Sequence, residues 1–157
     1  MGDEPIIRGI DAHKIYNSGA VTVHALRGVN LAIPRGEMVA IMGPSGCGKT
    51  TLLNCFSGLD DLTSGDVRIE NVSLAAMDDD TKSRYRARRM GFVFQSYNLL
   101  PVLSAVENVE LPLLVARVPA RESRRMALGL LKQVDLEGWA EHKPAQLSAG
   151  QQQRVAI

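Results

Sequence analysis

Short segments of alternating and β-branched residues occupy the first quarter of the chain, the pattern that is typical of β-strands. Ile6–Ile10 and Val29–Ile33 have this pattern. Pro34-Arg35-Gly36 then predicts a turn, and Met38–Met42 is an uninterrupted apolar run of the kind that forms a buried strand. We therefore expect an antiparallel β region followed by a strand of an α/β core.

Helical patterns follow, with two further strands between them. Thr50–Phe56 predicts a helix, and Val67–Ile69 predicts a strand after a turn. Three aspartates precede Thr81–Arg89, and carboxylates stabilise the amino terminus of a helix, so a second helix is expected there. Gly91–Phe94 is expected to be a strand that ends at Gln95.

The pattern becomes mainly helical after this strand. Ser104 and Glu107 have the spacing of a capping box, which predicts a helix that Pro112 ends or kinks. Another helix is expected from Pro119 onward. Its apolar positions fall on one face at helical spacing: Met126, Leu130, Leu131 and Val134.

One glycine-rich segment matches every fixed position of the phosphate-binding loop, G-x-x-x-x-G-K-[ST]. The segment reads Gly43-Pro44-Ser45-Gly46-Cys47-Gly48-Lys49-Thr50, and Thr51 follows it. It lies between an expected strand and an expected helix, which is the context that the motif requires. Glycines let successive backbone N–H groups face a phosphate, and the helix amino terminus adds further amides. We expect Lys49 to reach the outer phosphates of a nucleotide and the Thr50 hydroxyl to hold Mg²⁺.

A second motif lies about a hundred residues downstream and has the character of a helix start. It reads Leu147-Ser148-Ala149-Gly150-Gln151, in which Ser148 is a good N-cap. The motif resembles the signature of the ABC (ATP-binding cassette) ATPases, which most often reads LSGGQ. The resemblance implies that these residues contact the γ-phosphate of ATP held by a second copy of the subunit. Ala149 stands where glycine is more usual, and we expect this methyl group to be tolerated.

Two single residues extend the resemblance. Tyr16 occupies the place of an aromatic ring that stacks on adenine in this family, although it is also a reasonable half-buried strand tyrosine. Gln95 resembles the glutamine that contacts Mg²⁺ and the attacking water. Ser96–Pro101 together with Ala105–Val109 resembles the lipoprotein-release, macrolide-export and antimicrobial-peptide export branch of ABC transporters.

The resemblance implies an α/β fold, namely a phosphate-loop NTPase core of ABC type with an antiparallel β subdomain and an inserted α-helical subdomain. The expected organisation is core and β subdomain over 1–98, helical subdomain over 99–150, and the signature with its helix over 147–157. ATP and Mg²⁺ are the implied cofactors. The implied partners are a second ATPase subunit and an integral membrane permease. Leu99, Leu100 and Pro101 would belong to the permease contact, unless they pack inside the helical subdomain.

Acidic residues that the family uses for hydrolysis have no counterpart in this sequence. The family continues beyond the signature into a strand with a magnesium-binding Asp and a catalytic Glu, followed by a switch His. The sequence stops within the expected signature helix, at Arg154–Ile157, where no helix-ending signal occurs. We assign no catalytic residue, and we expect the chain to bind nucleotide without efficient hydrolysis.

Composition narrows the function further. The chain has 157 residues, is 45% apolar and carries a formal net charge of +1, so nothing in it favours nucleic-acid binding. It contains no apolar run of about 20 residues, and residues 1–5 are polar, unlike a secretory signal. We expect a cytoplasmic polypeptide that reaches the inner face of the plasma membrane only through its permease.

The two cysteines are expected to be free thiols. Cys47 and Cys55 are eight residues apart, or about 12 Å along a helix, which is too far for a disulfide. Because Cys47 lies in the phosphate loop beside Lys49, we expect it to be the more reactive thiol and to be shielded by ATP.

Two other classes of protein fit the sequence less well. A soluble ABC ATPase of DNA repair or translation would be favoured by basic grooves, coiled-coil insertions or tandem cassettes, and the sequence shows none of these. A different phosphate-loop enzyme, such as a kinase or a GTPase, is disfavoured by the LSAGQ motif. A GTPase would also need a guanine-selecting Asn-Lys-x-Asp segment, which the sequence lacks.

Overall fold

The computed structural model describes residues 4–19 and 21–157 and divides into two compact units, Met1–Arg86 and Ala87–Ile157. Residues 1–3 of the polar amino-terminal segment lie outside the described part of the chain. Each unit buries apolar side chains of its own.

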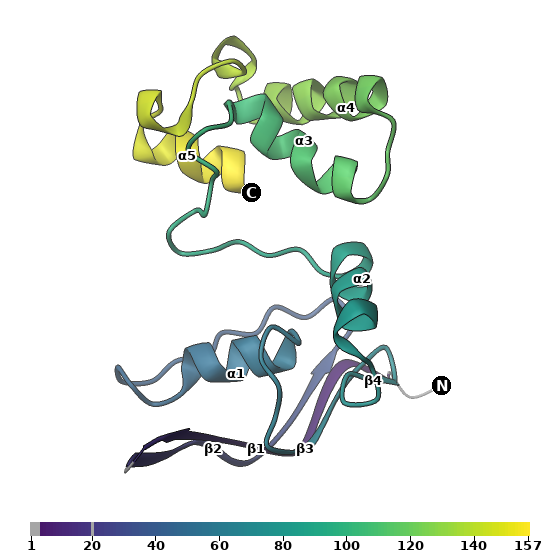
Figure 1. Ribbon diagram of the computed structural model, residues 1–157, viewed down its shortest axis with the longest axis vertical. Helices are drawn as coiled ribbons and strands as arrows, with labels where there is room; N and C mark the ends of the chain where they lie inside the picture. The colour runs from purple at the N-terminus through teal and green to yellow at the C-terminus, as the bar shows by residue number, and fades with distance from the viewer. Residues whose placement is uncertain (1–3, 20) are drawn as a thin grey trace. The chain divides into compact units, whose positions relative to one another are not determined.

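An antiparallel sheet forms one layer of the first unit (Figure 1). Its strands are β1 (Pro5–Ser18), β2 (Val21–Pro34), β3 (Ser64–Ile69) and β4 (Val72–Ser73), in the order β2-β1-β3-β4. Ile7 pairs with Ile33 and Tyr16 with Val23, which makes β1 and β2 one long hairpin. The predicted strands at the start of the chain and the strand at 67–69 are confirmed. The hairpin is longer than the sequence pattern indicated.

Helix α1 (Lys49–Phe56) packs on this sheet (Figure 1). Phe56 lies so close to β1 that a Cβ atom at Gly9 would come within 2.2 Å of its ring. The helix ends at Ser57, and Gly58 follows with a φ of +68°. Helix α2 (Asp79–Arg89) is confirmed but begins before the expected start at Thr81, and the side chain of Asp78 accepts a hydrogen bond of 2.7 Å from the Thr81 amide. The buried apolar side chains of this unit are Ala12, Leu26, Cys55, Phe56, Val67, Ile69 and Leu74.

Two predicted strands are absent. Met38–Met42 and Gly91–Phe94 have no regular secondary structure, and the Met38 side chain is 100% exposed. A strand requires hydrogen bonds to a neighbouring strand, and neither segment has such a partner among residues 4–19 and 21–157. The apolar pattern of these segments indicates suitability for a buried parallel sheet, but pattern alone does not supply the neighbouring strands.

The second unit is helical and packs around one core. It contains α3 (Ala105–Val115), α4 (Ala120–Gln133) and α5 (Ala149–Ala156), with short 3₁₀ helices at Glu137–Trp139 and Pro144–Gln146. α3 and α4 lie against each other (Figure 1). The core consists of Ala105, Val106, Ala127, Leu131, Leu136, Ala140, Leu147 and Val155.

Two details of these helices refine the sequence-based expectations. Pro112, which was expected to end or kink its helix, lies inside α3, which continues to Val115. α4 buries Ser123, Ala127 and Leu131, whereas Met126 and Leu130, predicted on its apolar face, are exposed. Small residues therefore line part of the α4 contact, which a search for large apolar side chains overlooks. Leu99 packs against the core and Leu100 is exposed. No helix in the described ranges is long and apolar enough to cross a bilayer.

Candidate nucleotide-phosphate site

The phosphate loop connects the end of the extended segment after β2 to the first turn of α1. Its glycines are required by geometry, because Gly46 and Gly48 have φ values of +80° and +95°. A Cβ atom at Gly48 would also lie 2.6 Å from the carbonyl oxygen of Ala25 in β2. At Gly46 a Cβ atom would meet nothing within 4 Å, so this turn of the loop faces open space.

Lys49 is the first residue of α1, and its ammonium group is held by the loop itself. It donates hydrogen bonds to the carbonyl oxygens of Gly43 at 2.9 Å and Pro44 at 2.7 Å. It also lies 3.7 Å from the Sγ atom of Cys47. These bonds place a positive charge at the amino terminus of α1, where the backbone amides and the helix dipole also favour an anion.

A cleft of about 910 Å³ opens in front of this loop. Pockets of roughly 300–1,000 Å³ hold most small ligands, so a nucleotide is of suitable size. None of the described residues that line the cleft is an aspartate or a glutamate, whereas Arg27 and Lys49 are cations. The remaining lining residues are Tyr16, Val23, His24, Ala25, Leu26, Val29, Ile41, Met42, Ser45, Gly46, Cys47, Gly48, Thr50, Thr51 and Leu52. The cleft therefore suits a polyanion.

Tyr16 lies on β1 and lines the same cleft as the phosphate loop, with 39% of its surface exposed. Its hydroxyl donates a hydrogen bond of 2.6 Å to Oδ2 of Asp60. The structure thus brings Tyr16 together with Lys49 and Thr50, as the sequence predicts. Its ring is partly exposed, which leaves surface for an adenine base.

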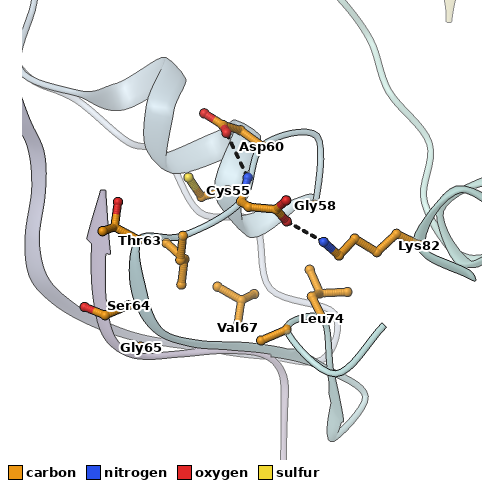
Figure 2. Close-up of a pocket in the computed structure, with 12 residues that line it drawn as sticks. Cys55, Gly58, Asp60, Thr63, Ser64, Gly65, Val67, Leu74 and Lys82 are labelled. Atoms are coloured by element: carbon orange, nitrogen blue, oxygen red, sulfur yellow. Dashed lines mark hydrogen bonds and ion pairs between the residues drawn. The ribbon is translucent and has the colours of Figure 1, made fainter. Parts of the chain in front are cut away.

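Asp60 was not found from the sequence. It lies in the connection between α1 and β3, at the rim of a smaller pocket of about 350 Å³ that Cys55 and Lys82 also line (Figure 2). The alternation of Lys14 and Tyr16 indicates that both side chains lie on one face of β1. Their shared partner is 44 residues away from Tyr16 in the sequence, and no local pattern reveals it.

Magnesium has one expected protein ligand in this unit, the Thr50 hydroxyl at the start of α1. No cluster of three or more His, Cys, Asp or Glu side chains that could hold a metal occurs among the described residues. Mg²⁺ is commonly held by few protein ligands together with water and substrate phosphates. The Thr50 hydroxyl, next to the phosphate loop, suits a Mg²⁺ ion that arrives with a nucleotide. It does not form a metal site by itself.

Gln95 and the signature residues belong to the second unit. Gln95 is exposed and lies in a turn in which the Tyr97 amide donates to the Phe94 carbonyl at 3.0 Å. It does not end a strand, because the predicted strand before it is absent. The rings of Phe92 and Phe94, which both precede Gln95, are stacked with their centroids 6.0 Å apart.

The signature begins α5 as predicted. Ser148 is the N-cap, and its hydroxyl accepts a hydrogen bond from the Gln151 amide at 3.3 Å. The Gln151 side chain in turn accepts one from the Ser148 amide at 2.8 Å. This capping box fixes the first turn of the helix, which contains Ala149 and Gly150. Amides of a first turn have no partner within their own helix, so they are suited to an anion.

Comparison with known proteins agrees with this geometry. A sequence model of the family described as ABC transporter matches residues 26–157. An uncharacterized ABC transporter ATP-binding protein of Thermotoga maritima is 53% identical over 94% of this chain and 63% of its own length. The lipoprotein-releasing system ATP-binding protein LolD of Legionella pneumophila is 44% identical over 92% of this chain and 64% of its own length. The chain thus spans a little under two thirds of these relatives.

A solved structure gives the same result for the fold. The ATP-binding cassette MJ0796, in a dimeric post-hydrolysis state bound to ADP and Pi, superposes with a TM-score of 0.87 and is 47% identical. The match covers 96% of this chain and 66% of the cassette. The phosphate loop, the signature and the match over most of the chain lead to one conclusion: the chain belongs to the ABC transporter family.

Proposed function

We propose that the chain is the nucleotide-binding part of an ABC transporter subunit that couples ATP to a membrane permease. The acid-free cleft in front of the phosphate loop is the observation that carries this proposal. A triphosphate brings several negative charges to a site that offers Lys49, Arg27 and the amides at the start of α1. An acidic residue in that lining would oppose such a ligand, and the described lining has none.

Several residues that line the cleft have a proposed role in binding. Lys49 exchanges at least one of its bonds to the Gly43 and Pro44 carbonyls for a phosphate oxygen. Amides from Gly46 to Thr50 contact the inner phosphates, and Thr50 holds Mg²⁺ that arrives with the nucleotide. Tyr16 stacks on adenine.

The remaining roles require further partners. Gln95 contacts Mg²⁺ and the attacking water, and Leu147–Gln151 contact the ATP of a second copy. The dimeric state of the related cassette and its ADP and Pi support this arrangement. The name of the Legionella relative supports lipoprotein release as the process served. The permease partner places the subunit at the cytoplasmic face of the membrane.

The described cleft lacks the carboxylates that hydrolysis of ATP commonly requires. Phosphoryl transfer requires groups that hold the metal and orient the attacking water, for which NTPases commonly use carboxylates. The described cleft lining contains neither Asp nor Glu. We therefore propose that this chain binds MgATP and releases it with negligible turnover.

Equilibrium binding of MgATP to the purified chain tests the proposal. Replacing Lys49 removes a charge-assisted bond worth roughly 1.5–3 kcal/mol, so Lys49→Ala should weaken binding about ten- to a hundredfold. Lys132→Ala is the matched control, because Lys132 is an exposed lysine on α4 in the second unit. Equal affinity of the Lys49→Ala variant and the unmodified chain would contradict the proposal.

A further inference from the structure

The ring of Tyr16 is held from outside the cleft by a network centred on one carboxylate. Asp60 accepts the Tyr16 hydroxyl on Oδ2 at 2.6 Å. Its other oxygen, Oδ1, accepts the Lys14 ammonium at 2.5 Å and the Asp61 amide at 2.8 Å. Figure 2 shows the bond from this backbone amide to the Asp60 carboxylate. Both oxygens of Asp60 are thus engaged, which fixes the carboxylate in one orientation.

The network is attached to the helix that carries the phosphate loop. The amides of Leu59 and Asp60 both donate to the carbonyl of Asn54, at 2.9 and 3.2 Å, in the last turn of α1. Lys49 begins the same helix. Eight residues of helix span about 12 Å, so α1 acts as a spacer between the phosphate cradle and the Asp60 anchor.

Lys14 is the third side chain of this network. Its side chain is 12% exposed, and its ammonium also donates to the Asp61 carbonyl at 2.6 Å. The ammonium lies 4.8 Å from the centroid of the Tyr16 ring, within reach of a cation–π contact. Lys14 therefore binds Asp60 and contacts the ring at the same time.

The protonation states of Asp60 and Tyr16 favour the hydrogen bond between them, which tethers the Tyr16 ring. Burial favours the neutral acid, but hydrogen bonds from Lys14 and Tyr16 overcome it and hold the pKa of Asp60 below its ordinary value. The hydrogen bond to Asp60 raises the pKa of Tyr16, and burial adds to the increase. At neutral pH Asp60 is thus an anionic acceptor and Tyr16 a neutral donor.

We propose that Asp60 is a positioning residue that sets the base end of the cleft by fixing the Tyr16 ring relative to the phosphate loop. Fixing the Tyr16 ring in this way makes the cleft selective for a nucleoside triphosphate over inorganic triphosphate. A ring held in place loses less conformational freedom when a base stacks on it than a freely rotating ring does. The inference rests on the proposed function, because it presumes that the phosphate loop holds a triphosphate.

Binding of MgATP and of inorganic tripolyphosphate, measured in parallel by calorimetry, tests this proposal. Tyr16→Phe keeps the ring and removes the tether, and Asp60→Ala removes the acceptor. Each should lower the preference for ATP over tripolyphosphate about two- to tenfold, the effect of one hydrogen bond. In the double variant the preference should fall no further than in either single variant, because both changes break the same contact.

Asp61→Ala is the matched control. Asp61 contributes only its backbone amide and carbonyl to the network, and alanine keeps both, whereas its carboxylate binds Lys82 on α2 (Figure 2). This variant should leave the preference for ATP unchanged. If Asp60→Ala does not fold, Tyr16→Phe and the control still decide the question.

The outcomes separate the inference from the proposed function. Equal weakening of both ligands, or an unchanged preference in Tyr16→Phe, would overturn the positioning role and leave phosphate binding intact. Lys49→Ala, measured in the same series, should weaken both ligands. Failure of the unmodified chain to bind either ligand would overturn the proposed function and this inference with it.

Discussion

Two cysteines, one in the phosphate loop before α1 and one near the end of α1, have very different environments. Cys47 is exposed in the phosphate loop, and its sulfur lies 3.7 Å from the Lys49 ammonium. Cys55 is buried, and burial raises the pKa of its thiol to about 11. Only a thiolate is an effective nucleophile, so these environments predict very different reactivity.

Alkylation should therefore distinguish the two thiols. With iodoacetamide near neutral pH, Cys47 should react more than about tenfold faster than Cys55. MgATP should slow the reaction at Cys47, whereas adenosine, which has no phosphates, should not. Peptide mass spectrometry gives both rates in one sample, with Cys55 as the internal reference. Equal rates at the two cysteines would contradict the described burial.

Helix starts are the elements that the sequence predicts best, because their signals are local. Ser104 and Glu107 form the capping box expected from their spacing, and Ser148 and Gln151 form a second one. The turn at Gly58 and the start of α2 also follow from neighbouring residues. Such features need only a few consecutive residues to form.

Strands and ion-pair networks are predicted less well, because they depend on distant partners. Met38–Met42 and Gly91–Phe94 have strand composition but no paired neighbour in the described part of the chain. The family resemblance assigns the phosphate loop and Tyr16 to one site, whereas the bond from Tyr16 to Asp60 depends on a partner 44 residues away and could not be predicted. The roles of Gln95 and the signature stay predictions.

The α3 cap offers a test at the scale of one element. Ser104 is 5% exposed, and its hydroxyl accepts the Glu107 amide. Ser104→Ala should lower the free energy of unfolding of the second unit by about 0.5–2 kcal/mol. Urea unfolding followed by the fluorescence of Trp139, the single tryptophan of the chain, reports on this unit.

Ser96→Ala is the control for this experiment, because Ser96 is an exposed serine outside the helices of the same unit. It should shift the unfolding midpoint by much less. A Ser104→Ala midpoint equal to that of Ser96→Ala would mean that the cap contributes no stability.

At the scale of the whole molecule, residues with proposed roles occur in both units. The first contains the phosphate loop, Tyr16 and the Asp60 network, and the second contains Gln95 and the signature. The chain spans 63% of its Thermotoga relative, so the activity of a complete subunit is a proposal that goes beyond these residues. In the proposed function the triphosphate itself is held by residues of the first unit, so its binding to the phosphate loop can be tested directly.

Hydrogen exchange of the backbone amides, followed by mass spectrometry with and without MgATP, is that test. The account predicts slower exchange in peptides that cover Gly43–Thr51, because the loop amides donate to the phosphates. Peptides from α3 (Ala105–Val115) should exchange at an unchanged rate and serve as the reference. Unchanged exchange over Gly43–Thr51 at a saturating concentration of nucleotide would contradict the central claim that this loop is the phosphate cradle.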